Sequence, residues 1–452
     1  MSLARTLRRW IKRNFESAGA GSRWPVPVMM ASPHRQVLAA RSLTETRANW
    51  LVGNTGIAES VVASWANSAI GDGPTVRSNH PNRAMANALE AAWLRAYDSI
   101  GIDGNDLASV LTLLSRSMVG AGEGLGRFVT TERGEVKVQV LLPEQVDASG
   151  NRDLNGGADG EITAGVERDA LGRIVAYWLR PDDWRATTQA VRVDAADVVH
   201  LFEQRWPGQL RGISWLAPVA TRIVELDALE DAGLTKAKSS ALVCGVIRDV
   251  DGQSSAVADL NAMMPLEPGA MVGPLPPGAD IAWTPVSDMS ALDSFTRHMV
   301  RSVAAGVGIP YALLSGDYSD SNYSSSRLAM QSFIRRVKAV RASILTARFL
   351  RPLWQRFVTL EVLSGRLNAP DFARDPSPYF DCSFLFPEFP HIAPLDETQA
   401  DALAIQAGIR SRQEVIAARG RDPQEVDDEI AADSFKPATK PGNVVSLTES
   451  AA

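Results

Sequence analysis

The run from Arg327 to Arg356 constrains the fold of this chain more than any other stretch. It carries eight Lys or Arg side chains and no acidic residue. Apolar residues recur through it at helical intervals, so the sequence predicts a long helix that extends to about Val362. Its apolar faces would pack on the protein and its basic side chains would cover the remaining surface. The apolar positions are Leu328, Phe333, Ile334, Val337, Ile344, Leu345 and Phe349.

The charge of the chain is strongly segregated, although the formal net charge is only −6. Residues 1–50 carry nine basic side chains against two acids, and residues 396–433 carry ten acids against four arginines. A weakly acidic chain with one basic stretch could contact nucleic acid locally without being a general nucleic-acid binder. Surface charge usually has a protein or solvent partner, so the pattern favours pairing with acids of another helix or subunit over contact with DNA phosphates.

The chain has 452 residues, enough for two or three domains, and its 45% apolar and 22% charged residues are typical of globular proteins. No apolar run approaches the ~18 residues that span a bilayer, and the N-terminus lacks a secretory apolar core, which predicts a cytosolic protein or assembly. Cys244 and Cys382 lack metal-ligand spacing, which predicts two buried thiols in a reducing compartment. The five histidines are scattered singly, so we expect structural roles and no metal site. They are His34, His80, His200, His298 and His391.

The first 15 residues predict an amphipathic helix. A helix of this kind binds either a membrane surface or a protein partner. Because the chain has no other membrane signal, we expect an arm that docks on a partner or a neighbouring subunit. Its apolar residues are Leu3, Leu7, Trp10, Ile11 and Phe15, and opposite them lie Arg5, Arg8, Lys12 and Arg13.

The remaining chain divides into a helical part, a β-rich part and a second, mainly helical part. Alternating strands and turn signals predict a β-rich block from about Gly126 to Phe202. Cap residues between Asp103 and Asp106 predict the start of a helix. The expected helices cover about 81–97, 106–118, 213–241 and 289–307, strands lie between about 265 and 285, a helical pair covers 396–433, and a disordered tail follows.

The cluster GAGEGLGRF, Gly120 to Phe128, is the one stretch that suggests a nucleotide site. A dinucleotide fingerprint needs a strand, the glycines and then a helix, whereas here a helix leads in and a strand leads out. The chain has no G-K-[ST] ending and no G-x-S-x-G elbow, and glycines that end a helix are expected on backbone grounds. We therefore expect no catalytic residue and no cofactor. A nucleotide-binding enzyme that uses Gly120–Gly126 stays as the weakest alternative.

The stretch GDYSDSNYSSSRLAM, Gly316 to Met330, is rich in hydroxyl groups. No histidine or glycine elbow accompanies them, so nothing in the sequence would activate them as nucleophiles. Small polar residues predict a flexible, hydrated loop, and Ser324 to Ser326 are predicted to cap the basic helix that follows.

Several segments, taken in order, resemble the lambda family of tailed-phage portal proteins. They are GVERDALGRIVAYWL (165–179), RWPGQLRGISWLAP (205–218), LDALEDAGLTKAK (226–238), GIPYALLSGDYSDSNYSSSRLAM (308–330) and ADALAIQAGIRSRQEVIAARGRDPQEVDDEIAAD (400–433). The resemblance covers about residues 40 to 434, and Asn-Tyr-Ser-Ser at 322–325 is its most specific piece. The run HIAPLDE (391–397) departs from the family pattern ahead of the last helices.

The resemblance implies an α+β portal-type fold with a wing, long stem helices, a β-containing clip, a channel loop and a helical crown, assembled as a closed ring, which in this family usually has twelve subunits. Its function would be a non-enzymatic channel at one capsid vertex through which double-stranded DNA is packaged and ejected. The implied partners are further copies of the chain, the large terminase subunit, the major capsid protein or scaffold, neck or adaptor proteins, and DNA held non-specifically, with no membrane. The protein would belong to the virion and assemble in the host cytoplasm. Another structural head or neck protein is the alternative.

By analogy with the family, the chain divides into nine parts. These are a basic arm and linker (1–40), a helical wing part (41–122), a β-rich region that includes the clip (123–207), a stem helix (208–245), wing strands and helix (246–307), the channel loop (308–326), the basic helix and wing (327–390), the crown (391–434) and a disordered tail (435–452).

The resemblance also implies two groups of site residues. Moving DNA should meet weak contacts, because many phosphate contacts would bind it too tightly to pass. The expected channel-loop residues are Ser315, Asp317, Tyr318, Ser319, Asn322, Tyr323 and Ser324. The expected contacts with DNA or a neighbouring subunit are Arg327, Arg335, Arg336, Lys338 and Arg341.

Overall fold

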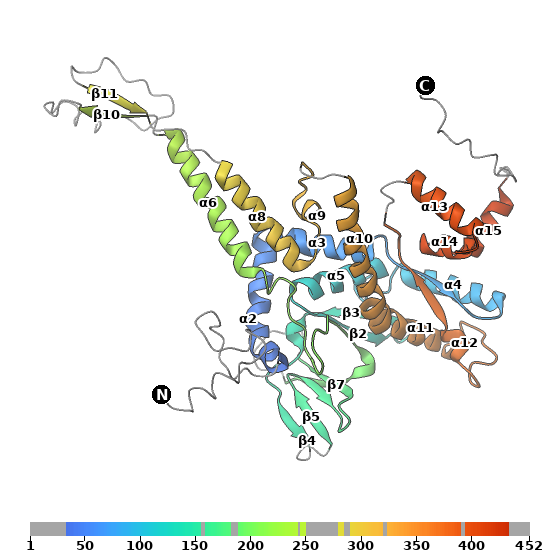
Figure 1. Cartoon of the computed structure of the whole chain (residues 1–452). Coiled ribbons are helices and arrows are strands. Elements are labelled where there is room, and N and C mark those ends of the chain that lie inside the picture. The colour runs from blue at the N-terminus through green and yellow to red at the C-terminus, as the bar shows by residue number, and fades with distance from the viewer. Residues whose placement is uncertain are drawn as a thin grey trace, which may run out of the picture.

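The computed structural model describes residues 33–154, 159–181, 189–242, 245–249, 279–283, 290–319, 323–389 and 394–433. Helices and small sheets mix in one body, from which a pair of long helices projects (Figure 1). The α+β class predicted from the sequence is therefore confirmed. The predicted arm helix and the tail lie outside the described residues, as do Cys244 and His391.

The first helices begin where their cap residues predict. The Asp106 carboxylate accepts a hydrogen bond from the backbone N–H of Ser109 at 2.8 Å, which satisfies a free donor of the first turn. Asn82 accepts one from the N–H of Ala84 at 3.0 Å in the same way. The helices are α2 (Pro33–Asn54), α3 (Gly56–Ile70), α4 (Arg83–Tyr97) and α5 (Leu107–Gly120).

The predicted β-rich block forms two antiparallel sheets. A three-stranded sheet has the order β3-β2-β9, and a five-stranded sheet runs in chain order from β4 to β8. The first sheet packs into the main core through Phe128, Val138 and Val199, whereas the second has a small core of its own around Val166. The strands are β2 (Gly124–Thr130), β3 (Val136–Leu141), β4 (Arg152–Leu154), β5 (Gly160–Thr163), β6 (Val166–Arg168), β7 (Ile174–Leu179), β8 (Val191–Asp194) and β9 (Val198–Leu201).

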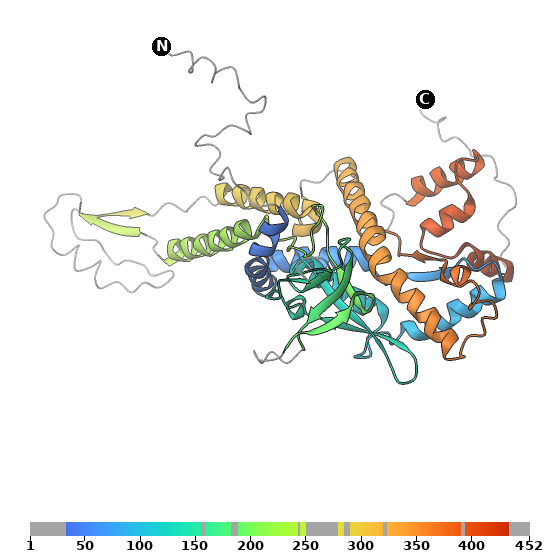
Figure 2. The ribbon, with the colours of Figure 1, turned by 90° about the horizontal axis from the view of Figure 1, so that it is seen from below.

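Two long helices, α6 (Ala220–Leu242) and α8 (Ser290–Val307), lie side by side and project from the body (Figures 1 and 2). At their far end β10 (Gly245–Asp249) pairs with β11 (Ala279–Trp283) in antiparallel register. At the near end Gly306 lies so close to Val219 that an added Cβ would meet its Cγ1 at 2.3 Å.

The sequence predicted that helix α6 begins at about Ile213, and this prediction is wrong. Residues 215–219 form turns that place the Trp215 and Leu216 side chains in the core, and the helix begins only at Ala220. Pro218 explains the difference, because a proline disfavours helical backbone in the residue before it.

The basic run forms one continuous helical rod, as predicted. Its first part is α10 (Tyr323–Val340), its middle part η5 (Arg341–Leu350) is a π-helix, and its last part is α11 (Arg351–Leu363). Pro352 is the second residue of α11, two positions after the π-helical stretch, and a proline ring disturbs the helical hydrogen bonds of the turn before it. Because the helix begins at Tyr323, Ser324 to Ser326 lie in its first turn and the prediction that they precede it as caps is wrong.

The C-terminal part returns to the body through one strand. Strand β12 (Cys382–Leu385) pairs with β1 (Thr75–Ser78), which joins segments about 300 residues apart. Where the sequence predicted a helical pair, three helices follow, because Gly408 and Gly420 adopt left-handed backbone with φ of 71° and 78° and end helices there. The helices of this part are α12 (Ser377–Phe380), α13 (Pro394–Gln406), α14 (Arg412–Ala418) and α15 (Pro423–Ala432).

Aromatic side chains hold the main core together. Trp65 of α3 packs edge-to-face on Trp215, with 4.7 Å between ring centroids, and on Phe333 of α10 at 5.0 Å. Cys382 is half-buried and free, and burial raises the pKa of its thiol to about 12, which agrees with an unreactive thiol.

Candidate functional site

The loop after the short helix α9 (Tyr311–Ser315) is fixed by one carboxylate. Asp317 accepts hydrogen bonds from the hydroxyl and the backbone N–H of Ser319, at 2.6 and 3.0 Å, and from the Tyr311 hydroxyl at 2.9 Å. These bonds, first among them the one from the Ser319 hydroxyl, lower the pKa of Asp317 to about 2. Ser315, Tyr318 and Ser319 are exposed. The loop thus presents hydroxyl groups and one carboxylate, which also lies 3.9 Å from the Arg297 guanidinium of α8 (Ser290–Val307).

The structure describes only part of the predicted channel-loop set. Asn322 lies outside the described residues, and for Tyr323 and Ser324 the backbone is placed at the start of α10 while the side chains are not described. Tyr311, which orients Asp317, was not among the predicted residues. Its spacing of six positions from the aspartate is not a recognised motif, so sequence offered no signal for it.

Arg336 points into its own subunit. Its guanidinium lies 5.0 Å from the ring of Trp65 and 5.4 Å from that of Trp215, a cation–π arrangement. It also donates a hydrogen bond to the carbonyl of Val307 at 3.1 Å, and Trp65 donates to that same oxygen at 3.2 Å. Val307 is the last residue of α8, so Arg336 ties the basic helix to the end of the projecting pair.

Arg341 is buried and binds three backbone carbonyls of its own chain. It donates to Ala69 at 2.8 Å, Ser68 at 3.0 Å and Pro387 at 3.1 Å. Its guanidinium also lies 4.9 Å from the ring centroid of Phe386 and 5.2 Å from that of Phe389. The first two carbonyls belong to the last turn of α3, where the negative end of the helix dipole favours a cation. Burial lowers the pKa of Arg341 to about 10.

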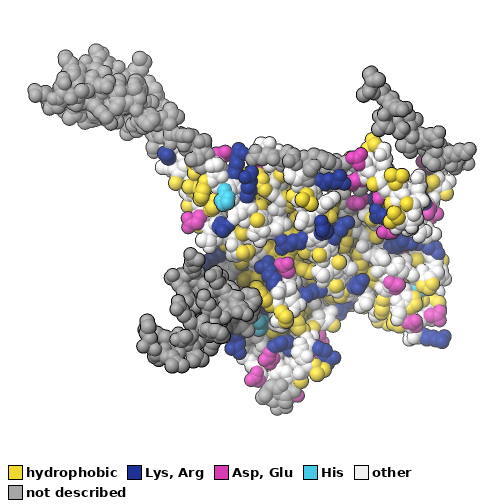
Figure 3. Space-filling model, viewed as in Figure 1, with side chains coloured by type: hydrophobic (Ala, Val, Ile, Leu, Met, Phe, Trp, Pro, Cys, Tyr) yellow, Lys and Arg dark blue, Asp and Glu magenta, His cyan; other side chains and the backbone are white. Residues whose placement is uncertain are grey.

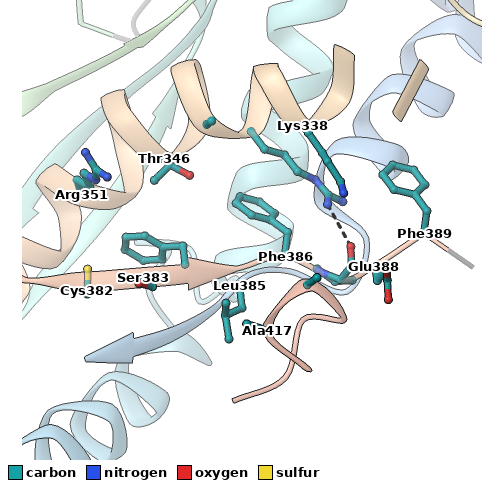
Figure 4. A pocket seen from close by; sticks show the side chains of 15 residues that line it. Lys338, Thr346, Arg351, Cys382, Ser383, Leu385, Phe386, Glu388, Phe389 and Ala417 are labelled. Atoms are coloured by element: carbon teal, nitrogen blue, oxygen red, sulfur yellow. Dashed lines mark hydrogen bonds between the residues drawn. The ribbon is translucent and has the colours of Figure 1, made fainter. Parts of the chain in front are cut away.

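Three basic side chains of the predicted set lie nearer the solvent. Arg335 and Lys338 are exposed on α10, and Lys338 borders a pocket of about 400 Å³ between the basic helix and the segment 382–389 (Figure 4). Arg327 lies 3.8 Å from Glu397 of α13. Basic side chains also recur over the middle of the face in Figure 3. The five predicted residues therefore do not form one patch, because Arg336 and Arg341 turn inward.

The glycine cluster after α5 packs against the protein's own backbone. An added Cβ at Gly122, whose φ is 103°, would come within 2.4 Å of Ile213 and Ser214, and one at Gly124 within 2.4 Å of the Leu114 carbonyl. Close backbone packing thus accounts for these glycines. The residue between them, Glu123, is a buried carboxylate, which would repel a phosphate.

Glu123 is the centre of a buried ion cluster. Arg211 donates two parallel hydrogen bonds to its carboxylate, both at 2.8 Å, and Arg41 of α2 lies 2.9 Å from it. Glu45 pairs with Arg41 at 3.0 Å, and His200 Nε2 lies 3.2 Å from Glu123. This five-residue group, called the Glu123 cluster below, joins α2, the turn before β2, β9 and the segment 205–218. Two residues of the RWPGQLRGISWLAP stretch are fixed in this way, because Arg211 binds the cluster and Trp215 enters the core.

The protonation states in the Glu123 cluster follow from burial and pairing. Burial opposes a charged Glu123, but Arg211 and His200 outweigh it and hold its pKa well below the usual value. Burial lowers the pKa of His200, whose Nδ1 lies 3.3 Å from the hydroxyl oxygen of Tyr177. Burial raises the pKa of Glu45 to about 7, although Arg41 opposes the shift.

No group of three or more His, Cys, Asp or Glu side chains within the described ranges could hold a metal ion. Among those same residues, no helix is long and apolar enough to cross a membrane.

The structure combines a projecting helix pair tipped by a strand pair, a loop that continues into a long helix, and a helical C-terminal part. The comparisons place this chain in a class of protein, the head-to-tail connectors of tailed phages and related particles. The family model "Phage portal protein, lambda family" matches residues 22–341. The chain therefore belongs to the lambda family of phage portal proteins, a family of structural proteins.

Relatives and solved structures agree with this assignment. Portal protein B of Escherichia phage lambda is 23% identical over 385 residues, 76% of this chain and 72% of the relative. The portal protein of Escherichia phage N15 is 23% identical over 436 residues, 84% of this chain and 81% of the relative. Among solved structures, a chain from the neck of a native gene transfer agent particle, computed with C12 symmetry, superposes with a TM-score of 0.50 at 16% identity and covers 90% of this chain and 97% of its own length.

Proposed function

We propose that this portal protein acts as a closed ring of twelve subunits that forms the DNA channel at one capsid vertex. Membership of the portal family is the observation that carries the proposal. A neck computed with C12 symmetry contains a chain of similar fold, which supports the subunit number. A ring needs heterologous, head-to-tail contacts that close by rotation, so each subunit would use two different faces.

In this proposal the projecting pair α6 and α8 is the stem. The sequence placed the clip within 123–207, but the strand pair β10–β11 lies at the far end of the stem helices (Figure 1), and this arrangement favours a clip that contains β10 and β11. The block 123–207 would then belong to the wing, because its three-stranded sheet shares the main core with α3, α5 and the basic helix. The segment 394–433 stays the crown candidate.

The loop around Asp317 is proposed to face the DNA. Exposed hydroxyl groups keep it hydrated, and a carboxylate with a pKa of about 2 stays charged and repels phosphate at any physiological pH. The exposed Arg335 and Lys338 are the remaining candidates on the basic helix for weak contact with DNA or a neighbour. Arg336 and Arg341 would act indirectly, by holding the helix in place.

The further partners are the large terminase during packaging, the capsid protein or scaffold during assembly, and neck proteins afterwards. Assembly in the host cytoplasm follows from these partners. Family membership is what supports this part of the proposal.

Imaging of the purified chain by electron microscopy tests the proposal directly. We expect rings with an axial hole and a mass, by native mass spectrometry, of twelve subunits. A chain that stays monomeric at high concentration would contradict it. A different ring order without terminase binding would instead favour another head or neck component, and ATP or NAD titration should show no binding at Gly120–Gly126.

A further inference from the structure

A groove on another part of the subunit is acidic, in contrast to the basic helix, and would bind a basic ligand. A groove of about 980 Å³ runs between α4, β1 and α15. Seven acidic side chains line it against two arginines, Arg83 and Arg421. The acids are Asp72, Glu90, Asp98, Asp422, Glu425, Asp428 and Glu429.

Most of this negative charge is not neutralised within the subunit. Of the seven acids, Asp422 pairs with Arg77 at 3.4 Å and Glu429 with Arg421 at 2.6 Å. Asp72, Asp98, Glu425 and Asp428 make no ion pair with the residues that the structure describes. Crowded like charges raise the free energy of the empty groove, and a cationic ligand would relieve this.

The groove also offers apolar contacts. Leu94 is 65% exposed in it, and Trp93 and Tyr97 of α4 also line it. The ligand that fits is therefore cationic and partly apolar, as a basic amphipathic peptide is.

The sequence contains one such peptide. Residues 1–20 carry five cations and one acid, and Leu3, Leu7, Trp10 and Ile11 share one side of the predicted helix. This segment precedes α2. Both views place α2 and α4 on opposite sides of the body (Figures 1 and 2). In a head-to-tail ring, opposite sides of adjacent subunits face each other.

We propose that the groove between α4 and α15 receives the basic N-terminal arm of a neighbouring subunit. The cations of the arm would pair with Asp98, Glu425 and Asp428, and its apolar side would cover Leu94. The inference rests on the proposed ring. Each arm would reach across one interface, so that the arms fasten the ring as a closed chain of contacts.

Cysteine cross-linking in the full chain tests the geometry. In a background that carries Cys244→Ser and Cys382→Ser, Trp10→Cys combined with Leu94→Cys should oxidise to covalent dimers and a ladder of higher multimers. The matched control replaces Leu94→Cys by Leu171→Cys, another exposed leucine (80%) outside the groove, and should give no ladder. A cross-link confined within one chain would overturn the assignment to a neighbour.

A peptide titration tests the chemistry and does not depend on ring formation. A labelled peptide of residues 1–20 should bind a chain that lacks them, as read by fluorescence anisotropy. Glu425→Lys with Asp428→Lys should weaken binding at least about tenfold, and a peptide with Arg8→Glu and Arg9→Glu should recover it on that variant. Binding of the peptide to duplex DNA or to phosphatidylglycerol vesicles, but not to the chain, would overturn the proposal.

The two proposals fail in different ways. Rings with an axial hole but neither cross-link nor peptide binding would overturn the arm contact and leave the portal ring intact. Peptide binding by a chain that forms no ring would overturn the ring and support recognition between arm and groove.

Discussion

The Glu123 cluster and the Asp317 loop each contain a carboxylate with a lowered pKa, but Glu123 is buried and Asp317 lies in a loop at the surface. Glu123 is 1% exposed, and its pKa is low because Arg211 and His200 outweigh the effect of burial. Asp317 also has a low pKa, but hydroxyl and backbone donors of its own loop cause it. In the cluster the charges fix the positions of four segments of the chain. In the loop the charge stays partly exposed, with Arg297 at 3.9 Å. The comparison teaches that a carboxylate with a lowered pKa can belong either to a buried structural joint or to a partly exposed loop, and that burial separates the two.

Glu123→Gln should have the largest effect and tests whether the buried carboxylate is a structural group. The change leaves Arg211 and Arg41 buried without a full counter-charge, and loss of one partner in a buried pair costs about 3–5 kcal/mol. Chemical denaturation of the purified chain should show this loss. Arg173→Ala, which removes an exposed pair with Asp169, is the control and should stay within about 0.5 kcal/mol. Equal losses for the two variants would mean that burial does not distinguish these carboxylates.

The pH dependence of stability tests Glu45 within the same cluster. Its folded pKa of about 7 lies above the ordinary 4.5, so the folded chain binds the proton more tightly and stability falls as the pH rises from about 4.5 to 7. Glu45→Gln should remove this slope and stabilise the chain at pH 8 by about 3 kcal/mol. Unfolding curves across this pH range measure it. Identical slopes for wild type and variant would show that folding does not raise the pKa of Glu45.

Arg341→Ala tests whether this inward-turned arginine of the basic helix caps the C-terminal end of α3. Loss of its three bonds to carbonyl oxygens should cost about 2 kcal/mol, with faster hydrogen exchange in the last turn of α3. Arg341→Lys should recover little, since an ammonium cannot make the same fork of bonds. If stability is unchanged while DNA retention falls, the side chain serves DNA rather than α3.

The smallest effect on stability is expected for Asp317→Asn. The loop is exposed, so the unfolding curve should not move measurably. In assembled rings, removal of one negative charge per subunit should raise affinity for duplex DNA by less than about threefold and change the salt dependence slightly. A clear loss of stability would place Asp317 with Glu123 as a structural group and remove the contrast.

Local signals predicted local structure well. Asp106 marked the start of α5, and the apolar periodicity of residues 327–362 predicted the long helix. The sequence did not predict the pairing of Glu123 with Arg211, because the two residues lie 88 positions apart and only the packed fold brings them together. Nor could periodicity distinguish Arg335 from Arg341, since the difference depends on the α3 carbonyls that lie opposite one of them. The acidic run after residue 396 was visible, but its apposition to α4 was not.

The close approach of Gly306 to Val219 has a mechanical consequence. It is the point where α6 and α8 leave the body, and the Val307 carbonyl beside it is held by Arg336 and Trp65. Helix α6 has 23 residues, so at 1.5 Å per residue the strand pair at its tip lies roughly 35 Å away. A rotation of about 5° at this pivot would move the tip by about 3 Å. Arg336 joins the near end of the helix pair to α10, the helix that follows the Asp317 loop. If the pair rotates as one body about this point, a small displacement at the loop would become a larger displacement at the tip.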